Sequence, residues 1–347
     1  MAETMRAARF VAPGHGVEIH EVARPDPGPL DVVVRIEACG ICLSDVHLFD
    51  GSIPPIVQPV TPGHEPCGVI EDAGPLVPDG RVGRRVAVMG GRPCTRCRMC
   101  RNGRADECRS LEIMGFHYDG AWADYVVVPY YAVSPVPDHV PVEQAAILAD
   151  AVATPYAALA DRAGLRAGES IGLWGIGGLG THAVQIARLL GAGLVVAIDP
   201  LESARKRAVD LGADVALDPS EQDVPAEITA LTSGAKLDVA VDLVGSNAVL
   251  KQAVHCLGVG GRAVMVGLSL EQLELGPGIL LGVQSQSILG HLGYRKKHLD
   301  DLVHLVARGR LDLSGSISDV LPLDRVGEGI DRLATKSGDP VRLIVRP

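Results

Sequence analysis

The chain has 347 residues, of which 47% are hydrophobic, and its formal net charge at pH 7 is −10. This length predicts two domains, each able to bury a core of its own. An acidic chain of this kind is not typical of proteins that bind nucleic acid. No run of eighteen apolar residues occurs, and the first ten residues lack the apolar stretch of a signal peptide. We therefore expect a cytoplasmic protein with no membrane partner.

The pattern of apolar residues changes character about 150 residues into the chain. The first 130 residues are rich in glycine and proline and contain short β-type runs such as DVVVRIEA and ADYVVVP. From Glu169 the pattern alternates strand, turn and helix, which indicates a parallel sheet covered by helices. A further helix is predicted at KKHLDDLVHLVARG. We therefore expect an α/β protein with a β-rich domain at 1–151, a sheet domain at 152–292 and a C-terminal segment at 293–347.

Eight cysteines crowd mainly into the first third of the chain, beside histidines, which favours metal binding over disulfides in a chain of this kind. Four of them lie in a lobe at 90–110 with the spacing C-x2-C-x2-C-x7-C: Cys94, Cys97, Cys100 and Cys108. The fourth is too distant for a ferredoxin-type run and no proline follows it. A redox pair needs only two cysteines, and a nucleic-acid knuckle is expected in a basic protein. Four thiolates predict a closed, structural zinc site, with the six arginines of the lobe balancing its charge.

A glycine-rich turn lies where the predicted sheet domain begins. The stretch IGLWGIGGLGTHAVQIARLLGA contains G-x-G-x-x-G as Gly175, Gly177 and Gly180, between an apolar strand and a helix. This context predicts a dinucleotide site in which pyrophosphate meets the helix N-terminus. Asp199 ends the next strand and is expected to bind the adenosine ribose, which favours NAD over NADP. Arg205 follows within two turns and leaves NADP open.

Cys42 in ACGICLSDVH and His64 in TPGHEPCGV are the two ligand types that zinc prefers. A catalytic zinc uses three protein ligands, so a third must come from elsewhere in the chain.

These motifs, in this order, resemble the zinc-dependent alcohol dehydrogenases of the medium-chain dehydrogenase/reductase superfamily over essentially the whole chain. The markers are GICLSDVH at 40–47, GHE at 63–65 with Gly68 and Gly74, the four-cysteine lobe, and the turn at 175–180. The resemblance implies a GroES-like β-rich catalytic domain and a doubly wound Rossmann NAD-binding domain. The segment 293–347 is expected to return to the catalytic domain.

The resemblance also implies a catalytic zinc beside the structural one, with Cys42 and His64 as ligands. Asp150 stands at the position of the third ligand, where cysteine or glutamate is common in the family; the alternative is that Asp150 caps a helix. Glu65 is implied to approach the metal during ligand exchange, and Asp45 to orient the ligand histidine. Ser44 and His47 are implied to relay the substrate proton through the nicotinamide ribose to solvent.

The cofactor contacts implied by the resemblance extend beyond the three glycines. They comprise Gly178 and Leu179 in the turn, Asp199, Arg205 and Val266. Leu43 stands where several family members carry a basic residue facing the cofactor pyrophosphate, and Arg342 is a candidate to replace that cation.

The expected activity is hydride transfer between NAD and a small alcohol or its carbonyl partner, in a homotetramer or homodimer. Three alternatives stay open: a polyol, amino-alcohol or acyl-CoA-linked hydroxyl dehydrogenase; a zinc-dependent enone reductase; and a redox- or NAD-sensing binding protein without enzymatic activity. The substrate itself is set by loops that no motif identifies.

Overall fold

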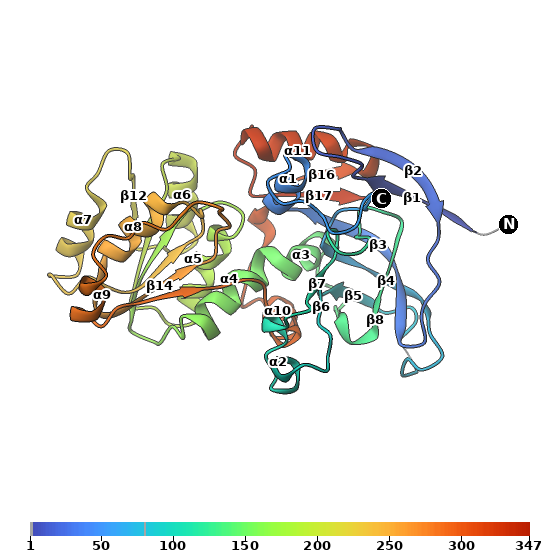
Figure 1. The fold of residues 1–347 in the computed structure, drawn as a ribbon, viewed down its shortest axis with the longest axis horizontal. Helices are drawn as coiled ribbons and strands as arrows, with labels where there is room; N and C mark the ends of the chain where they lie inside the picture. The colour runs from blue at the N-terminus through green and yellow to red at the C-terminus, as the bar shows by residue number, and fades with distance from the viewer. Residues whose placement is uncertain (1–2, 80) are drawn as a thin grey trace. The chain divides into compact units, whose positions relative to one another are not determined.

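The structure is a computed structural model, and it describes residues 3–79 and 81–347. The chain divides into two compact units, one formed by Met1–Ala153 with Gly293–Pro347 and the other by Thr154–Leu292 (Figure 1). Within the described residues, none of the helices combines the length and apolar character needed to cross a bilayer.

The first unit is built on a seven-stranded sheet with the order β16-β17-β3-β4-β5-β9, and β8 also pairs with β3. Figure 1 shows the C-terminal strands, in red, beside the blue strand β3, so the two ends of the chain share one sheet. Two small sheets, β1-β2 and β6-β7, complete the unit. The strands are β1 Thr4–Arg9, β2 Glu18–Ala23, β3 Asp31–Ile41, β4 Glu65–Ala73, β5 Arg85–Val88, β6 Gly91–Arg92, β7 Glu112–Ile113, β8 Tyr125–Pro129, β9 Val133–Pro135, β16 Ile317–Pro322 and β17 Arg342–Arg346.

Strand β3 is the longest of these, with 11 residues. Its valine and isoleucine residues favour a strand because β-branched side chains pack well on a pleated, buried surface. Val32, Val34 and Ile36 recur with the period of two that places them on one face, in a core that also holds Trp122. The unit's helices are α1 Leu43–Phe49, α2 Arg98–Arg101, α3 Val142–Ile147, α10 Lys296–Ala307 and α11 Val326–Thr335, with short 3-10 helices at Ala105–Glu107, Tyr130–Ala132, Ser314–Ser316 and Leu323–Arg325.

A helical segment leads from the first unit into the second. It runs from α3 through a π-helical turn at Leu148–Val152, α4 at Ala153–Ala157 and a second π-helical turn at Ala158–Arg162. The small-residue composition of this segment carries no sign of the two π turns. Asp150 lies inside the first of them and not at a helix start, so the N-cap alternative for Asp150 is wrong.

The second unit is a six-stranded parallel sheet with the order β12-β11-β10-β13-β14-β15. This is a doubly wound order, in which the direction of strand addition reverses between β10 and β13, and it confirms the predicted fold class. Its strands are β10 Ser170–Trp174, β11 Leu194–Ile198, β12 Val215–Leu217, β13 Leu237–Asp242, β14 Leu257–Met265 and β15 Ser287–Gly290. Its connecting helices are α5 Gly180–Leu189, α6 Glu202–Asp210, α7 Val224–Leu231, α8 Asn247–His255 and α9 Ile279–Val283.

One face of this sheet packs on α7 and α8 through a cluster that includes Trp174, Ile198, Ile228 and Leu250. The strands are nearly continuous runs of buried apolar residues, as expected for a parallel sheet buried on both faces. In such sheets ligands bind beyond the carboxyl ends of the strands, near the point where the strand order reverses.

Candidate active site and metal centres

Cys42 is presented by the junction between strand β3 and helix α1, where it occupies the residue before the first helical turn. The backbone N–H of Cys42 donates to the carboxylate of Asp45 over 2.8 Å, which fixes the start of the helix. The other oxygen of Asp45 lies 3.5 Å from Nδ1 of His64. Asp45 is fully buried, so one carboxylate holds both a cysteine and a histidine in place.

His64 precedes strand β4 and follows Gly63, which has a φ of +91°. A side chain on Gly63 would come within 2.4 Å of the Trp122 ring, so both the backbone conformation and the close packing require glycine here. This turn directs the imidazole toward Cys42.

The third predicted ligand reaches the same place from a distant segment. Asp150 Oδ2 lies 3.4 Å from Cys42 Sγ and 3.8 Å from His64 Nε2. Two ligands of one tetrahedral zinc stand roughly 3.4–3.6 Å apart, given the usual zinc–sulfur, zinc–nitrogen and zinc–oxygen bond lengths. The ligand atoms of these three residues and of Glu65 all lie within 4.8 Å of one another. A thiolate, an imidazole and a carboxylate at these spacings fit one zinc ion with a fourth position left open.

The charges around His64 favour a cation at this point. Burial alone would lower the pKa of His64, but the carboxylates of Asp45 and Asp150 outweigh burial and raise that pKa well above its usual value. For Glu65, burial raises the pKa to about 8, and the positive charge of Arg342 opposes this increase. Within the described residues, neither oxygen of Glu65 accepts a hydrogen bond, although the Arg342 guanidinium lies 3.3 Å from one of them. Such a concentration of buried acidic groups is stabilised by a divalent ion.

Arg342, at the start of β17, has a different environment from the one the sequence suggests. Its guanidinium is 3% exposed, donates to the carbonyl of Ile41 over 3.2 Å and lies 3.3 Å from Glu65. Arg342 is therefore the ion-pair partner of Glu65, next to the residues Cys42, His64 and Asp150 that could hold a metal. Its contact with the cofactor pyrophosphate stays a prediction.

Sequence reasoning missed Tyr294, which also belongs to this site. Its hydroxyl accepts a hydrogen bond from the backbone N–H of Gly90 over 3.1 Å. Burial raises the pKa of Tyr294 far above the usual value, and the charge of Asp150 adds to this effect. The phenol is therefore a neutral donor near the ligands. Only its segment's return to the first unit could have signalled this role, because the GYRK stretch carries no motif.

The two residues of the predicted proton relay lie on helix α1. The Ser44 hydroxyl is 3.5 Å from Cys42 Sγ, and Nδ1 of His47 lies 3.5 Å from Asp50. Ser44 and His47 are three positions apart, so they share a face of the helix. The Ser44 hydroxyl therefore lies beside the Cys42 sulfur, and the His47 imidazole lies one turn farther along helix α1.

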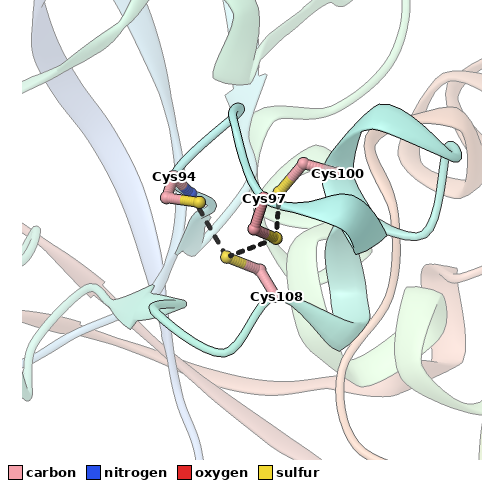
Figure 2. Close-up of side chains that lie close together, drawn as sticks. All are labelled: Cys94, Cys97, Cys100 and Cys108. Carbon is pink, nitrogen blue, oxygen red and sulfur yellow. Dashed lines mark hydrogen bonds between the residues drawn. The ribbon is translucent and has the colours of Figure 1, made fainter.

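The four-cysteine lobe forms a second cluster. Figure 2 shows the four sulfurs directed toward one another from the short helix α2 and the loops that flank it. Cys97 Sγ lies 3.5 Å from Cys100 Sγ and 3.9 Å from Cys108 Sγ, and all four sulfurs lie within 4.8 Å of one another. About 3.8 Å is the sulfur–sulfur separation in a tetrahedral zinc–thiolate site. The set fits zinc and fills its coordination shell.

Backbone N–H groups act on these thiols directly. The N–H of Cys100 is the main cause that lowers the pKa of Cys97 to about 6, which favours the thiolate that zinc needs. The arginines of the lobe are less uniform than expected. Arg92 pairs with Glu112 and Arg104 with Glu107, so two of the six have carboxylate partners and do not serve the thiolates alone.

Arg295 binds the lobe from outside. It donates to the carbonyl of Gly103 over 3.3 Å and lies 3.8 Å from Asp106. Arg295 thereby anchors the four-cysteine lobe to the start of α10.

The glycine turn of the second unit joins β10 to α5. Gly175 has a φ of +90°, and a side chain on Gly180 would come within 1.9 Å of the Gly175 carbonyl oxygen. Around Gly177, by contrast, there is open space. The turn therefore leaves room for a phosphate group over Gly177, next to the N-terminus of a ten-residue helix, with Gly178 and Leu179 in between.

Asp199 directly follows β11 and is anchored by two backbone N–H groups, those of Ile176 at 2.7 Å and Leu201 at 2.8 Å. These bonds hold its carboxylate beside the glycine turn, where a ribose hydroxyl would bind. Arg207 was not predicted: it donates to the carbonyl of Ile176 and to the hydroxyl of Thr181, bracing the turn. Val266 follows β14 and bonds to the carbonyl of Asp242.

Two family models match the chain. The alcohol dehydrogenase GroES-like domain matches residues 28–138, and the zinc-binding dehydrogenase domain matches residues 178–308. The first match confirms the GroES-like character of the β-rich unit.

Similar proteins match almost the full length. An alcohol dehydrogenase of Geobacillus stearothermophilus is 33% identical over 91% of this chain and 92% of its own. An NAD-dependent alcohol dehydrogenase of Sulfurisphaera tokodaii is 32% identical, with coverage of 95% and 96%. An L-threonine 3-dehydrogenase of Pyrococcus horikoshii is 31% identical, with coverage of 92% of each chain.

Among solved structures, a putative zinc-binding dehydrogenase of Sinorhizobium meliloti bound to NADP superimposes with a TM-score of 0.92. It is 32% identical, and the match covers 99% of this chain and 100% of the other. The chain therefore belongs to the zinc-dependent alcohol dehydrogenases of the medium-chain dehydrogenase/reductase superfamily.

Proposed function

We propose that this protein is an NAD-dependent zinc alcohol dehydrogenase that interconverts a small alcohol and its aldehyde or ketone. One observation carries the proposal. Cys42, His64 and Asp150, from three separate segments, converge within 4.8 Å beside the buried Glu65. The same chain has a glycine turn whose Ile176 N–H donates to Asp199. Metal ligands and a dinucleotide turn together are the requirements of this chemistry.

Cys42, His64 and Asp150 would hold the catalytic zinc, and Cys94, Cys97, Cys100 and Cys108 the structural one, which gives two zinc ions per chain. When bound, zinc acts as a Lewis acid on the substrate oxygen, while the nicotinamide exchanges hydride with the carbinol carbon. Glu65 supplies a spare carboxylate next to the ligands, which supports its role in ligand exchange.

Ser44 takes the proton of the substrate hydroxyl in this proposal, and His47 passes it to solvent. The position of the Ser44 hydroxyl next to the Cys42 sulfur supports the first step. The partly exposed ring of His47, one helical turn later, supports the second. Enone reduction needs no such relay, so these two residues favour alcohol oxidation.

The cofactor is proposed to bind the second unit through Gly175, Gly177, Gly178, Leu179 and Gly180, with Asp199 on the adenosine ribose and Val266 on the same side of the sheet. The catalytic domain would comprise 1–151 and 293–347, and the NAD-binding domain 152–292. The division of the chain after Ala153 and after Leu292 supports this assignment.

The protein is proposed to be a cytoplasmic homo-oligomer, a tetramer or dimer joined through strand β15. This strand is at one edge of the six-stranded sheet, and the apolar side chains of Ile279 and Val283 next to it in sequence are 72% and 74% exposed. An unpaired edge beside exposed apolar residues is suited to pairing with a second copy. Light scattering after size exclusion would measure the mass.

The activity is tested by NADH formation with a panel of primary and secondary alcohols, diols and amino alcohols. L-Threonine belongs in the panel because a relative of 31% identity is named as an L-threonine 3-dehydrogenase. Turnover of simple alcohols would support the proposal. Turnover of amino alcohols alone would favour the amino-alcohol alternative, and normal zinc and NAD binding without any turnover would favour a sensing protein.

A further inference from the structure

The cofactor selectivity of the second unit depends on what Arg205 binds. An arginine near the end of the second strand of a dinucleotide fold is the group that accommodates the 2′-phosphate of NADP. Here Nη1 of Arg205 donates to the carbonyls of Asp199, at 2.9 Å, and Pro200, at 2.7 Å. The same nitrogen lies 2.7 Å from Oδ2 of Asp218. Three acceptors therefore compete for the two protons of this one nitrogen.

Asp218 is fixed in the position from which it binds Arg205. It directly follows β12, the strand that pairs with β11, so Asp218 and Asp199 stand at neighbouring strand ends. Its other oxygen accepts hydrogen bonds from the N–H and hydroxyl of Ser220. Its own N–H donates to the Gln222 side chain over 2.7 Å. The side chain is 11% exposed, and that of Arg205 is 20% exposed.

We propose that Asp218 determines cofactor selectivity by binding the Arg205 guanidinium and so withholding it from a 2′-phosphate. The bonds of Nη1 to a carboxylate and two carbonyls fix the guanidinium, which must break them to turn this nitrogen toward a phosphate. Asp199, anchored by Ile176 and Leu201, then presents its negative charge to the 2′ position. The adenosine site accepts a ribose with a free 2′-hydroxyl and rejects a phosphorylated one.

This inference rests on the proposed cofactor site and goes beyond it. Asp199 alone disfavours NADP through repulsion, as the sequence predicts. The structure adds that the nearby cation, which would offset this repulsion, is held by a second carboxylate. Arginine binds phosphate through two parallel N–H bonds, so its release changes affinity strongly.

The test compares binding of adenosine 2′,5′-bisphosphate and 5′-AMP by calorimetry, which needs neither zinc nor turnover. Asp218→Asn keeps an oxygen for Ser220 but removes the charge that holds Arg205. We expect D218N to bind the bisphosphate about tenfold more tightly than the wild type does, with 5′-AMP affinity little changed. The double variant R205A/D218N should lose this gain, and NADP titrations should follow the same order.

Asp210→Asn is the matched control because it removes one negative charge from α6, where Asp210 pairs with Lys206. An equal gain in D210N, a gain that survives in R205A/D218N, or no gain in D218N would each overturn the inference. If D218N does not fold, as judged by thermal unfolding, Asp218→Ser offers an acceptor for Ser220 and the same comparison applies. Failure of the wild type to bind 5′-AMP and NAD would instead refute the proposed cofactor site.

Discussion

Arg342 and Glu65 form a pair shielded from solvent beside the proposed zinc ligands, with Nη2 of Arg342 3.3 Å from Oε1 of Glu65. Arg342 is the first residue of the last strand and Glu65 the first residue of β4, so strand β3 between them brings the pair together. A side chain on Gly40 would come within 2.0 Å of Glu65 Oε2, so glycine makes the space that Glu65 fills.

Removing Arg342 should therefore destabilise the protein more than a typical surface change. Above the pKa of about 8 that burial gives Glu65, Arg342→Gln leaves the ionised carboxylate buried without a cation, a loss of about 3–5 kcal/mol in unfolding free energy. The double variant E65Q/R342Q should recover part of this loss because no isolated charge remains. Urea unfolding measures both. Equal stability of the wild type and R342Q would show that the pair does not form.

Two glycines of the cofactor turn should respond differently to alanine. Gly180→Ala places a methyl group against the Gly175 carbonyl, so it should lower both thermal stability and NAD affinity. Gly177→Ala meets no protein atom and should leave stability unchanged while weakening NAD binding, because the methyl group occupies the phosphate's path. Thermal unfolding and NAD titration separate the two effects. Unchanged NAD affinity in G177A would contradict the proposed path.

Mutations in the four-cysteine lobe should lower the stability of the protein more than they affect hydride transfer. Cys97→Ser should remove about one zinc per chain and lower the melting temperature, because the helix α2 has no buried residue and the proposed zinc would take the place of a core. Cys256→Ser is the control, since Cys256 belongs to the core of the second unit and to neither cluster, so the zinc content should stay unchanged. An unchanged melting temperature combined with lost hydride transfer in C97S would mean that this metal is catalytic.

His298 should make stability fall in mild acid. Its ring is 1% exposed, and burial, with Arg295 and Lys297 nearby, lowers its pKa from 6.5 to about 4. Between these values the unfolded chain binds a proton that the folded chain does not, so stability decreases as the pH falls from about 6.5 to about 4. Asn in place of His298 retains an acceptor for the Arg295 N–H, which caps helix α10, and should flatten this part of the profile. Urea unfolding at several pH values measures the slope, and identical slopes in both proteins would refute the assignment.

Short motifs were sufficient to predict much of the fold and the local parts of the site. The alternation after Glu169 predicted the parallel sheet, and the cysteine spacing predicted a four-thiolate cluster. Asp150 came from the family resemblance, because no local pattern links it to Cys42, 108 residues away. The π-helical turn that carries it leaves no mark in the sequence.

Other contacts could not be predicted from the sequence, because they form only when distant segments pack together in the folded protein. Arg342 meets Glu65 only after the last strand joins β3, and Tyr294 meets Gly90 across 204 residues. Arg295 stands beside Lys296 and Lys297 in the sequence, whereas its partners are a carbonyl and a carboxylate of the four-cysteine lobe. Charge alone does not tell an exposed arginine from one that anchors another segment.

The most direct test of the account is NADH formation by the zinc-loaded wild type and Asp150→Ala, with zinc content and NAD affinity measured on the same samples. We predict two zinc ions per chain and alcohol-dependent NADH formation in the wild type. D150A should keep NAD affinity but lose about one zinc and most of its activity, and Asp150→Cys should restore part of both. Two zinc ions and full activity in D150A would contradict the central claim, as would a wild type that binds zinc and NAD but oxidises no alcohol.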